Sequence, residues 1–539
     1  MARTLNAVDR LRRGLPGAAA RARQRRVVAA LSWRRVLVGD VLPLLLGAVS
    51  TLAYSPFKLF PLNLLALAAL FELWDRAATP REAAWRGWMF GVGSFGTGIY
   101  WIYISVHDMG HAPAWLGVGA TALLVAYCAL YPALVGYGVT RWTPRTRLLR
   151  GLLVLPGAWV LSELLRSWLF TGFPWLSLGY AWVGTGLRSV GPILGVFGIS
   201  WVVALFAGMV WMVFRGATVP RLVSVVLIAA LAAGILALPK PLAWTHNAGS
   251  SMRVTLIQGD VPQTEKWQQQ YFKPTLERYL KLTQKSSQSR LIIWPEAAIP
   301  GLYGQLKSSF FDPLGQMLQK QGQTLLTGVL IHDPHNGDYY NSAVALGASQ
   351  GRYDKRHLVP FGEYYPLPGF IRSLLGDVVA LPYSDLSSGT AHEGPLTLAG
   401  HKVGILICYE DAFSRDALTE VPQAHMLINI SNDAWFGRSL GPWQHLEMAR
   451  MRALETGRPL LRDTNTGVSA VIGPQGALDA LAPQFRVDRL TYTIVPRAGA
   501  TPFVAMGGNW PLWLASFFCV LIGVATWWIG ASRGDQGRR

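Results

Sequence analysis

Long apolar segments separated by short polar connections dominate the first half of the chain. Seven such segments precede residue 240, and an eighth lies near the C-terminus. Each is close to the roughly 20 residues that a helix needs to cross the hydrocarbon core of a bilayer. The pattern therefore predicts eight transmembrane helices. Their expected ranges are 36–54, 59–74, 87–106, 115–139, 151–170, 190–214, 222–238 and 511–529.

Arginine residues gather in every second connection between these segments. They follow the second, fourth and sixth segments and include Arg76, Arg81, Arg86, Arg141, Arg145, Arg147, Arg150, Arg215 and Arg221. Connections rich in Lys and Arg stay in the cytoplasm. We therefore expect both termini in the cytoplasm and the long stretch between the seventh and eighth segments on the opposite side of the membrane.

That stretch, residues 243–508, changes to an alternation of short strands and helices. Strands are expected at 253–258, 291–294, 324–331, 341–346, 402–408, 426–431, 468–472 and 491–495. Helices are expected at 271–285, 307–321, 412–420 and 443–456. Such alternation predicts a layered α/β domain. The sequence therefore predicts a division into 1–35 (basic tail), 36–242 (membrane domain), 243–508 (catalytic domain), 509–531 (eighth transmembrane helix) and 532–539 (second tail).

Composition agrees with a membrane protein. Of 539 residues, 51% are hydrophobic and only 15% are charged, and there are 22 tryptophans, which is too apolar for an ordinary soluble protein. A net charge of +19 would suggest nucleic acid in a soluble chain. Here the arginines flank hydrophobic segments or lie in the first 35 residues. We therefore expect attraction to anionic lipid and no nucleic-acid partner.

One cysteine stands out in the α/β stretch. Cys408 ends an apolar strand and is followed by Tyr409, Glu410 and Asp411, whereas Cys128 and Cys519 fall in membrane segments. A thiol at a strand end, with free backbone N–H groups nearby, can serve as a nucleophile. The alternative is a buried apolar cysteine. Because a single thiol outside the cytoplasm has no disulfide partner, a chemical role is favoured.

Two further strand ends carry ionisable residues. Glu296 follows the strand at 291–294 between Pro295 and Pro300, and Lys355 begins a basic cluster before a loop rich in Pro and Gly. Either residue alone is typical of a solvated surface. The scattered histidines, among them His357, His401 and His445, give no metal-ligand spacing, so no metal is expected.

These motifs together resemble the carbon-nitrogen hydrolase (nitrilase) superfamily, whose triad is Glu, Lys and Cys in this order. Within it the chain is similar to the membrane-anchored apolipoprotein N-acyltransferase family, and the similarity extends over nearly all of it except the N-terminal tail. The stretches that carry the resemblance are Gln258-Gly259-Asp260, Trp294-Pro295-Glu296, 355–363, Ile407-Cys408-Tyr409-Glu410, 431–437, Gly441-Pro442-Trp443-Gln444-His445, 448–455 and Gly508-Asn509-Trp510-Pro511.

The resemblance implies a fold and a reaction. The α/β domain would be a nitrilase-like αββα sandwich in the periplasm of a bacterium, anchored in the inner membrane. Glu296 would be the general base, Lys355 the oxyanion stabiliser and Cys408 the nucleophile. An acyl chain from the sn-1 position of a phospholipid such as phosphatidylethanolamine would pass through a thioester to the α-amine of the diacylglyceryl-cysteine of an apolipoprotein. No cofactor is needed, and we expect a monomer.

Other residues are assigned supporting or substrate-binding roles. Glu363, Tyr409 and Glu410 are expected to support the triad, although Tyr409 and Glu410 also suit a plain strand end. Substrate-binding candidates are Trp267, Trp435, Phe436, Glu163 and Arg166. The aromatic residues suit a bilayer interface, with ordinary core packing as the alternative. Glu163 and Arg166 lie one helical turn apart inside a membrane segment and are expected to hold a phospholipid headgroup, or else to form a structural pair.

Two other functions remain open at this stage. A membrane-tethered amidase or nitrilase could use the same triad and pass its acyl group to water. Eight transmembrane helices for one catalytic domain argue against it, because such a hydrolase has no use for them. A transporter or scaffold is disfavoured because the spans contain few charges and no inverted repeat is visible.

Overall fold

Apolar residues of the strands alternate between two faces, and this alternation builds a four-layer sandwich. The computed structural model describes residues 37–365, 385–390 and 394–536. In β3 (Leu291–Ile293), Leu291 and Ile293 face the inner core, whereas Ile292 faces outward to the helices. Strand β8 (His401–Ile407) does the same with Ile405 and Leu406. A period of two therefore gives each sheet two apolar faces.

Two six-stranded sheets form the centre of this domain. The first has the order β13-β2-β3-β4-β5-β6 and the second β12-β11-β10-β9-β8-β7. Besides β3, the first sheet contains β2 (Met252–Gln258), β4 (Thr324–His332), β5 (Tyr339–Gly347), β6 (Gly351–Asp354) and β13 (Asp488–Ile494). Besides β8, the second contains β7 (Leu396–Leu398), β9 (Met426–Ser431), β10 (Leu460–Thr464), β11 (Ala470–Ile472) and β12 (Leu478–Leu481). A separate antiparallel pair joins β1 (Thr245–Asn247) to β14 (Arg497–Gly499).

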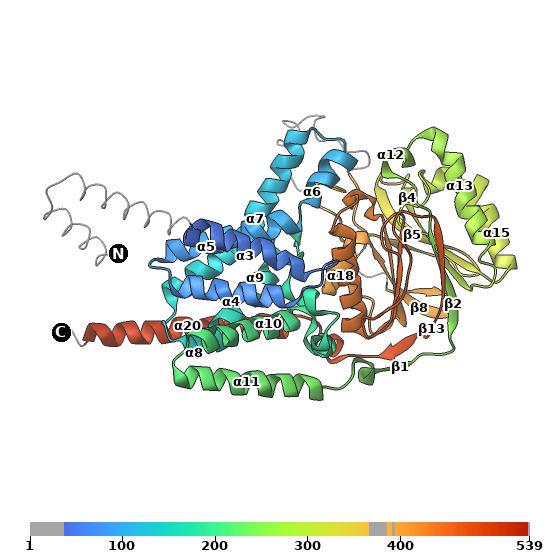
Figure 1. The fold of residues 1–539 in the computed structure, drawn as a ribbon. Helices are drawn as coiled ribbons and strands as arrows, with labels where there is room; N and C mark the ends of the chain where they lie inside the picture. Colours follow the sequence, from blue (N-terminus) through green and yellow to red (C-terminus); the bar gives the residue numbers. More distant parts are fainter. Residues whose placement is uncertain (1–36, 366–384, 391–393, 537–539) are drawn as a thin grey trace.

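Helices cover the outer face of each sheet. On the first sheet lie α13 (Gln269–Gln284) and α15 (Asp312–Lys320), and on the second lie α17 (Ser414–Leu418) and α18 (Gly441–Thr456). Short helices α12 (Gln263–Lys266), α14 (Tyr303–Leu306) and α19 (Pro502–Ala505) connect them. The result is an αββα sandwich, with α18 between the sheets and the helical bundle (Figure 1).

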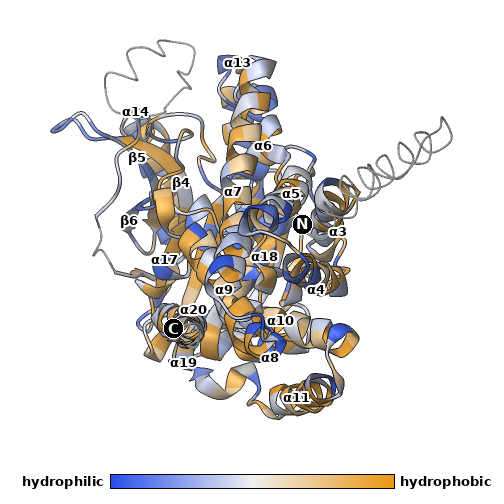
Figure 2. Ribbon diagram, turned by 90° about the vertical axis from the view of Figure 1, so that its left-hand side faces the viewer, coloured by the Kyte–Doolittle hydropathy of each residue, from blue (hydrophilic) through white to orange (hydrophobic). Residues whose placement is uncertain are grey.

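In the described residues the bundle contains eight main helices of unequal length. They are α3 Leu42–Ser50, α4 Pro61–Asp75, α5 Pro80–Gly98, α7 Ala114–Trp142, α9 Leu155–Arg166, α10 Gly191–Arg215, α11 Thr218–Ala237 and α20 Trp510–Gln536. Short turns flank them, including α6 (Trp101–Tyr103) and α8 (Arg147–Leu149). Figure 2 shows hydrophobic colouring along much of α7 and α11.

Five of the described helices are long and apolar enough to cross a membrane, or six if α5 and the bent continuation Trp101–Met109 form one span. The expected number of eight therefore stays a prediction. Helix α4 has only 15 residues, about 22 Å at 1.5 Å per residue. Yet Lys58, in the connection between α3 and α4, pairs at 3.7 Å with Glu447 of α18. That connection thus lies on the side of the bundle that faces the α/β sandwich.

Glycines allow the bundle helices to approach closely. A Cβ atom at Gly93 of α5 would lie 2.0 Å from the backbone oxygen of Leu44 in α3, and one at Gly91 would lie 2.6 Å from Cα of Ala129 in α7. Small residues at such crossings are the usual means of packing helices in lipid.

The structure corrects the bounds of two helices that the sequence predicted. The helix expected at 412–420 is broken: a 3-10 turn, Cys408–Ala412, is followed by extended Phe413 and the short α17. The helix expected at 151–170 ends at Arg166. Six strands, namely β1, β6, β7, β10, β12 and β14, were not predicted from the sequence; five of them have only three or four residues, and β10 (Leu460–Thr464) has Arg462 and Asp463 at its centre. The tail at 1–35 and the last residues of the tail at 532–539 lie outside the described residues.

Candidate active site

The three expected triad residues each follow a strand of the sandwich. Glu296 comes after β3, Lys355 directly after β6 and Cys408 directly after β8. Strand β3 is parallel to β2 and β4, and β8 is parallel to β9. Because each sheet delivers its strand ends to one edge, the sandwich gathers residues that are far apart in sequence.

Lys355 lies between two carboxylates. Its Nζ atom is 2.8 Å from Oε1 of Glu363 and 3.6 Å from Oε1 of Glu296, and the residue is 1% exposed. Burial alone would lower the pKa of this lysine, but the charges of Glu363, Glu296 and Cys408 overcome burial and raise the pKa. Lys355 therefore keeps its positive charge throughout the physiological pH range.

Asn341 joins the two carboxylates. Its Nδ2 donates to Glu296 Oε1 at 2.7 Å and to Glu363 Oε1 at 3.0 Å. The other oxygen of Glu296 accepts from the backbone N–H of Asn432 at 2.8 Å. Glu296 is thereby fixed in one orientation, as a general base must be.

Cys408 is held in a left-handed backbone conformation with φ of +52°, which is strained for a residue other than glycine. Burial, and after it the charge of Glu296, raise the pKa of the thiol; Lys355 and a hydrogen bond from Ser431 oppose this shift. The thiol is thus protonated at neutral pH. Attack on a carbonyl carbon requires a base to take its proton, and Glu296 is the carboxylate coupled most strongly to it.

Glu410 connects the turn Cys408–Ala412 to the residues that follow Lys355. It is fully buried and accepts from the backbone N–H groups of Ile407 at 2.7 Å and Arg356 at 2.8 Å. The Tyr353 hydroxyl and the His357 N–H also donate to it. Burial raises the pKa of Glu410 to about 7. Its contacts therefore connect the residues after β6 to the end of β8, and its role in support of the triad stays a prediction.

Tyr409 points the other way, into the helical bundle. Its hydroxyl donates to the backbone oxygen of Gly172 at 2.7 Å, and its ring stacks on Trp175 with centroids 5.9 Å apart. Both partners lie in the connection after α9. The residue next to Cys408 thus contacts the helical bundle directly.

A buried ionic network behind Cys408 was not foreseen from the sequence. Arg462 of β10 donates to Asp411 at 2.8 Å and to Asp433 at 3.0 Å, and His445 Nε2 is 2.7 Å from Asp411. His445 also lies 3.3 Å from the Cys408 backbone oxygen. The motifs at 431–437 and 441–445 contained Asp433 and His445, but Arg462 lies in a strand that the hydropathy pattern did not reveal.

Lys266 is a second unforeseen residue. It is 1% exposed, and its Nζ lies 3.5 Å from the backbone oxygen of Glu296. Burial lowers the pKa of Lys266 to about 8, against a smaller opposing effect of Glu296. Its polar neighbours Gln263, Glu265 and Gln268 gave no sign of burial in the sequence.

The aromatic substrate candidates differ in exposure. Trp267 is 38% exposed beside Lys266, and Trp435 is half-buried. Phe436 is buried, with its ring edge-on to Trp101 at 4.6 Å. Core packing thus describes Phe436 well, whereas Trp267 is partly exposed to solvent. Their roles in binding substrate stay predictions.

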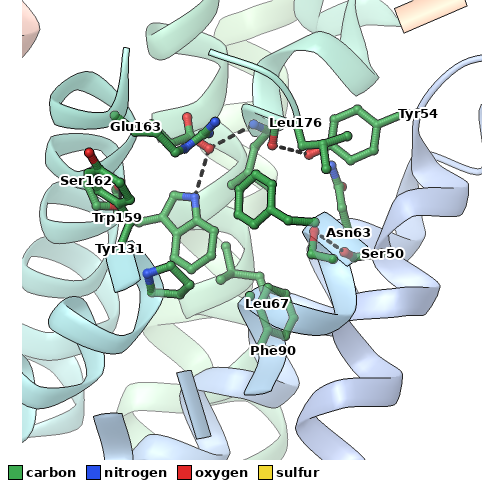
Figure 3. Close-up of a pocket in the computed structure, with 16 residues that line it drawn as sticks. Ser50, Tyr54, Asn63, Leu67, Phe90, Tyr131, Trp159, Ser162, Glu163 and Leu176 are labelled. Atoms are coloured by element: carbon green, nitrogen blue, oxygen red, sulfur yellow. Dashed lines mark hydrogen bonds between the residues drawn. The ribbon is translucent and has the colours of Figure 1, made fainter. Parts of the chain in front are cut away.

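Glu163 and Arg166 lie in the bundle, away from the triad. Both are 3% exposed. Glu163 Oε1 accepts from Trp159 Nε1 at 3.0 Å and from the Leu178 N–H at 2.9 Å (Figure 3). They line a cavity of about 30 Å³, room for about two water molecules. Neither residue bonds to the other in the described contacts, and both headgroup binding and the structural pair stay predictions. In the described part of the chain no group of His, Cys, Asp and Glu could hold a metal ion.

Comparisons with known proteins cover both halves of the chain. Residues 46–209 match the family model of the apolipoprotein N-acyltransferase N-terminal domain, and residues 253–502 match that of carbon-nitrogen hydrolases. The chain is 43% identical to an apolipoprotein N-acyltransferase of Methylococcus capsulatus, over 86% of this chain and 92% of that protein. It is 39% identical to one of Nitrosomonas europaea, over 86% and 93%. It is 37% identical to an apolipoprotein N-acyltransferase of Chromobacterium violaceum, over 93% of this chain and 96% of that protein.

Proposed function

Because the chain belongs to the apolipoprotein N-acyltransferase family, we propose that it transfers a fatty acyl chain from the sn-1 position of a phospholipid to the α-amine of a diacylglyceryl-cysteine. The observation that carries this proposal is a buried Lys355, set between Glu296 and Glu363 and electrostatically coupled to Cys408. A domain of this chemistry, packed on a bundle of apolar helices, suits substrates that stay in the bilayer.

In the first half-reaction the sulfur of Cys408 attacks the ester carbonyl. Glu296 accepts the thiol proton, and the Lys355 ammonium stabilises the negative charge that develops on the carbonyl oxygen. When the intermediate collapses, the C–O bond breaks and Glu296 returns the proton to the leaving oxygen. The products are a lysophospholipid and an acyl-thioester on Cys408.

In the second half-reaction the neutral amine of the apolipoprotein attacks the thioester. Glu296 takes a proton from the amine, the C–S bond breaks, and the proton returns to the sulfur. An amide is formed and the thiol is regenerated, so the cycle balances without a cofactor. Glu363 holds Lys355 in position through both steps, because the Lys355 ammonium lies closer to the Glu363 carboxylate than to that of Glu296.

The orientation of the protein follows from its charges. Asp75 at the end of α4 pairs with Arg147 at 3.0 Å and Arg150 at 3.6 Å, and Glu72 pairs with Arg215 at 3.1 Å. The arginine-rich connections are thus gathered at one end of the bundle, whereas Lys58 contacts the catalytic domain at the other. This arrangement supports eight spans, cytoplasmic termini, a periplasmic catalytic domain and an inner-membrane location.

Membrane placement of the site has an energetic reason. Drawing an acyl chain into water costs roughly 0.8 kcal/mol per CH₂. A catalytic domain held at the membrane surface avoids that cost for phosphatidylethanolamine-like donors and for the lipid part of the apolipoprotein. We propose that a monomer suffices, with the domain division 36–242, 243–508 and 509–531, because the triad comes from one sandwich.

Intact-protein mass spectrometry tests the first half-reaction. Purified protein is incubated with phospholipid alone, as wild type and as Cys408→Ala and Cys408→Ser; Cys128→Ala and Cys519→Ala are matched controls, because both residues are buried in the bundle. We expect a hydroxylamine-labile gain of one acyl chain in the wild type and both controls, and none in Cys408→Ala. With an apolipoprotein acceptor, free fatty acid without N-acylated product would point instead to the hydrolase.

A further inference from the structure

The connection between α9 and α10 approaches the nucleophile from the membrane side. It includes Thr171, Gly172 and Trp175, followed by the 3-10 turn Leu178–Trp182. We refer to residues 170–180 as the α9–α10 loop. Besides the Tyr409 contacts to Gly172 and Trp175, the Tyr180 hydroxyl donates to the Ala412 backbone oxygen at 3.3 Å. The turn that starts at Cys408 is therefore contacted by this loop at several points.

The loop has a strained backbone. Phe170, Thr171 and Leu176 have φ values of +52°, +73° and +58°. Each such residue costs on the order of 1 kcal/mol or more and persists only where the surroundings impose it. Gly172 has φ of +96°, and a Cβ atom there would lie 2.1 Å from the Ser167 backbone oxygen. The loop would not keep this shape without residues that hold it.

Arg166 and Glu163 of α9 supply that restraint. The Arg166 guanidinium donates to the backbone oxygens of Phe173 at 2.6 Å and Trp175 at 2.5 Å. It also reaches the Ser177 hydroxyl at 3.3 Å. The Leu178 N–H donates to Glu163 Oε1. Figure 3 shows Glu163 and Leu176 on facing sides of this region, with Tyr54 donating to the Leu176 oxygen.

The geometry points to Arg166 and Glu163 as positioning residues for Cys408: they fix the α9–α10 loop, and the loop holds the strained turn that carries the thiol. This inference rests on the proposed function for its chemistry. Its physical reason is that Cys408 itself has a positive φ, so its turn keeps this shape only while its contacts hold it, and Tyr409 and Ala412 carry the contacts that come from the loop. The membrane domain then acts as one wall of the nucleophile site in addition to anchoring it.

The test is a double-mutant cycle in the full-length protein in lipid nanodiscs. Arg166→Lys keeps the charge but loses the fork that grips two carbonyl groups. Tyr409→Phe keeps the ring and loses the bond to Gly172. We expect each of these two substitutions to lower the rate constant of Cys408 acylation about tenfold or more, because a small displacement of the reacting groups slows a reaction strongly. Because both act through one loop, the double variant should be little slower than the slower single one.

Several outcomes would overturn the inference. Multiplying effects in the double variant would show that Arg166 and Tyr409 act independently. A rise in KM for the phospholipid with unchanged kcat would assign Arg166 to headgroup binding. Arg86→Lys is the matched control, because Arg86 is also buried in the bundle but bonds to Leu73 and Glu82; it should leave acylation within about twofold. If Arg166→Lys fails to fold, Ser177→Ala removes one partner of Arg166 more gently.

A lipid-free readout separates this inference from the proposed function. The rate at which a small alkylating reagent modifies Cys408 is measured by peptide mass spectrometry, which distinguishes Cys408 from Cys128 and Cys519. We expect Arg166→Lys and Tyr409→Phe to change this rate about tenfold at equal melting temperature. An unchanged rate overturns the inference. A wild type that is alkylated normally but never acylated by phospholipid contradicts the proposed function and leaves the positioning result standing.

Discussion

The ammonium nitrogen of Lys266 lies 3.5 Å from the backbone oxygen of Glu296, in a site where burial lowers the pKa of this lysine to about 8. The charge of Glu296 opposes this lowering of the pKa, but burial outweighs it. A buried ammonium without a paired charge is costly at neutral pH. Lys266 is therefore a place where pH and stability are coupled.

We predict that Lys266→Met stabilises the protein at pH 7, and that the gain shrinks as pH rises. The folded protein binds this proton less tightly than the unfolded chain, whose lysine has a pKa near 10.5. Between pH 8 and 10.5 deprotonation therefore stabilises the wild type by up to about 3 kcal/mol, whereas the variant is unaffected. Melting temperatures at pH 7 and pH 10 measure this. A wild-type-minus-variant difference that does not change with pH would contradict it.

Lys355→Met should abolish most acylation. The substitution removes the positive charge that favours the thiolate of Cys408 and that faces the developing oxyanion. Loss of one such stabilising group costs about 10²–10³ in rate. Lys355→Arg should not restore activity, because a planar guanidinium does not fit where a compact ammonium sits between two carboxylates. Single-turnover acylation measures both.

The control for that prediction is Lys273→Met. Lys273 is exposed and pairs with Glu277 at 3.9 Å on the surface of α13. Exposed pairs contribute little, so this variant should acylate at the wild-type rate. Equal loss in Lys273→Met and Lys355→Met would mean that the effect of Lys355 is general destabilisation.

Glu410→Gln should weaken both stability and acylation, although glutamine has nearly the same shape. One oxygen of Glu410 accepts from Arg356 and His357 and the other from Ile407. The amide NH₂ cannot accept, so at least one buried backbone N–H loses its partner, at about 1–3 kcal/mol. A lower midpoint of unfolding, with slower acylation, is expected. Asp488→Asn should change neither, because Asp488 lies in β13, at the opposite side of the first sheet from β6.

Membrane topology can be tested at the short helices. With eight spans, Lys58 lies on the periplasmic side and Arg81 on the cytoplasmic side of the membrane. In cells with a permeabilised outer membrane, an impermeant thiol reagent should label Lys58→Cys and not Arg81→Cys. Labelling of both would show that α4 does not cross, and labelling of Arg81→Cys alone would show that α4 crosses in the opposite direction.

Much of the architecture was determined by the sequence alone, because hydropathy is a local property. The switch from long apolar segments to alternating strands placed the catalytic domain, and all eight expected strands occur within a few residues of their predicted bounds. The order Glu296, Lys355, Cys408 was readable because each residue ends an apolar strand within a recognisable motif. Helices such as α7 and α10 were equally clear, since a membrane span needs only length and apolarity.

What only the tertiary structure decided are contacts between residues far apart in sequence. The burial of Lys266 and Arg462 depends on the sheets that close over them, and neither residue's neighbours announce it. Phe436 looked like an exposed aromatic but packs against Trp101, from a segment more than 300 residues earlier. Glu163 and Arg166 were predicted from their depth in a membrane helix, but only the folded α9–α10 loop shows what they hold. Side-chain periodicity fixes which face is apolar, and the partner of that face is set by packing.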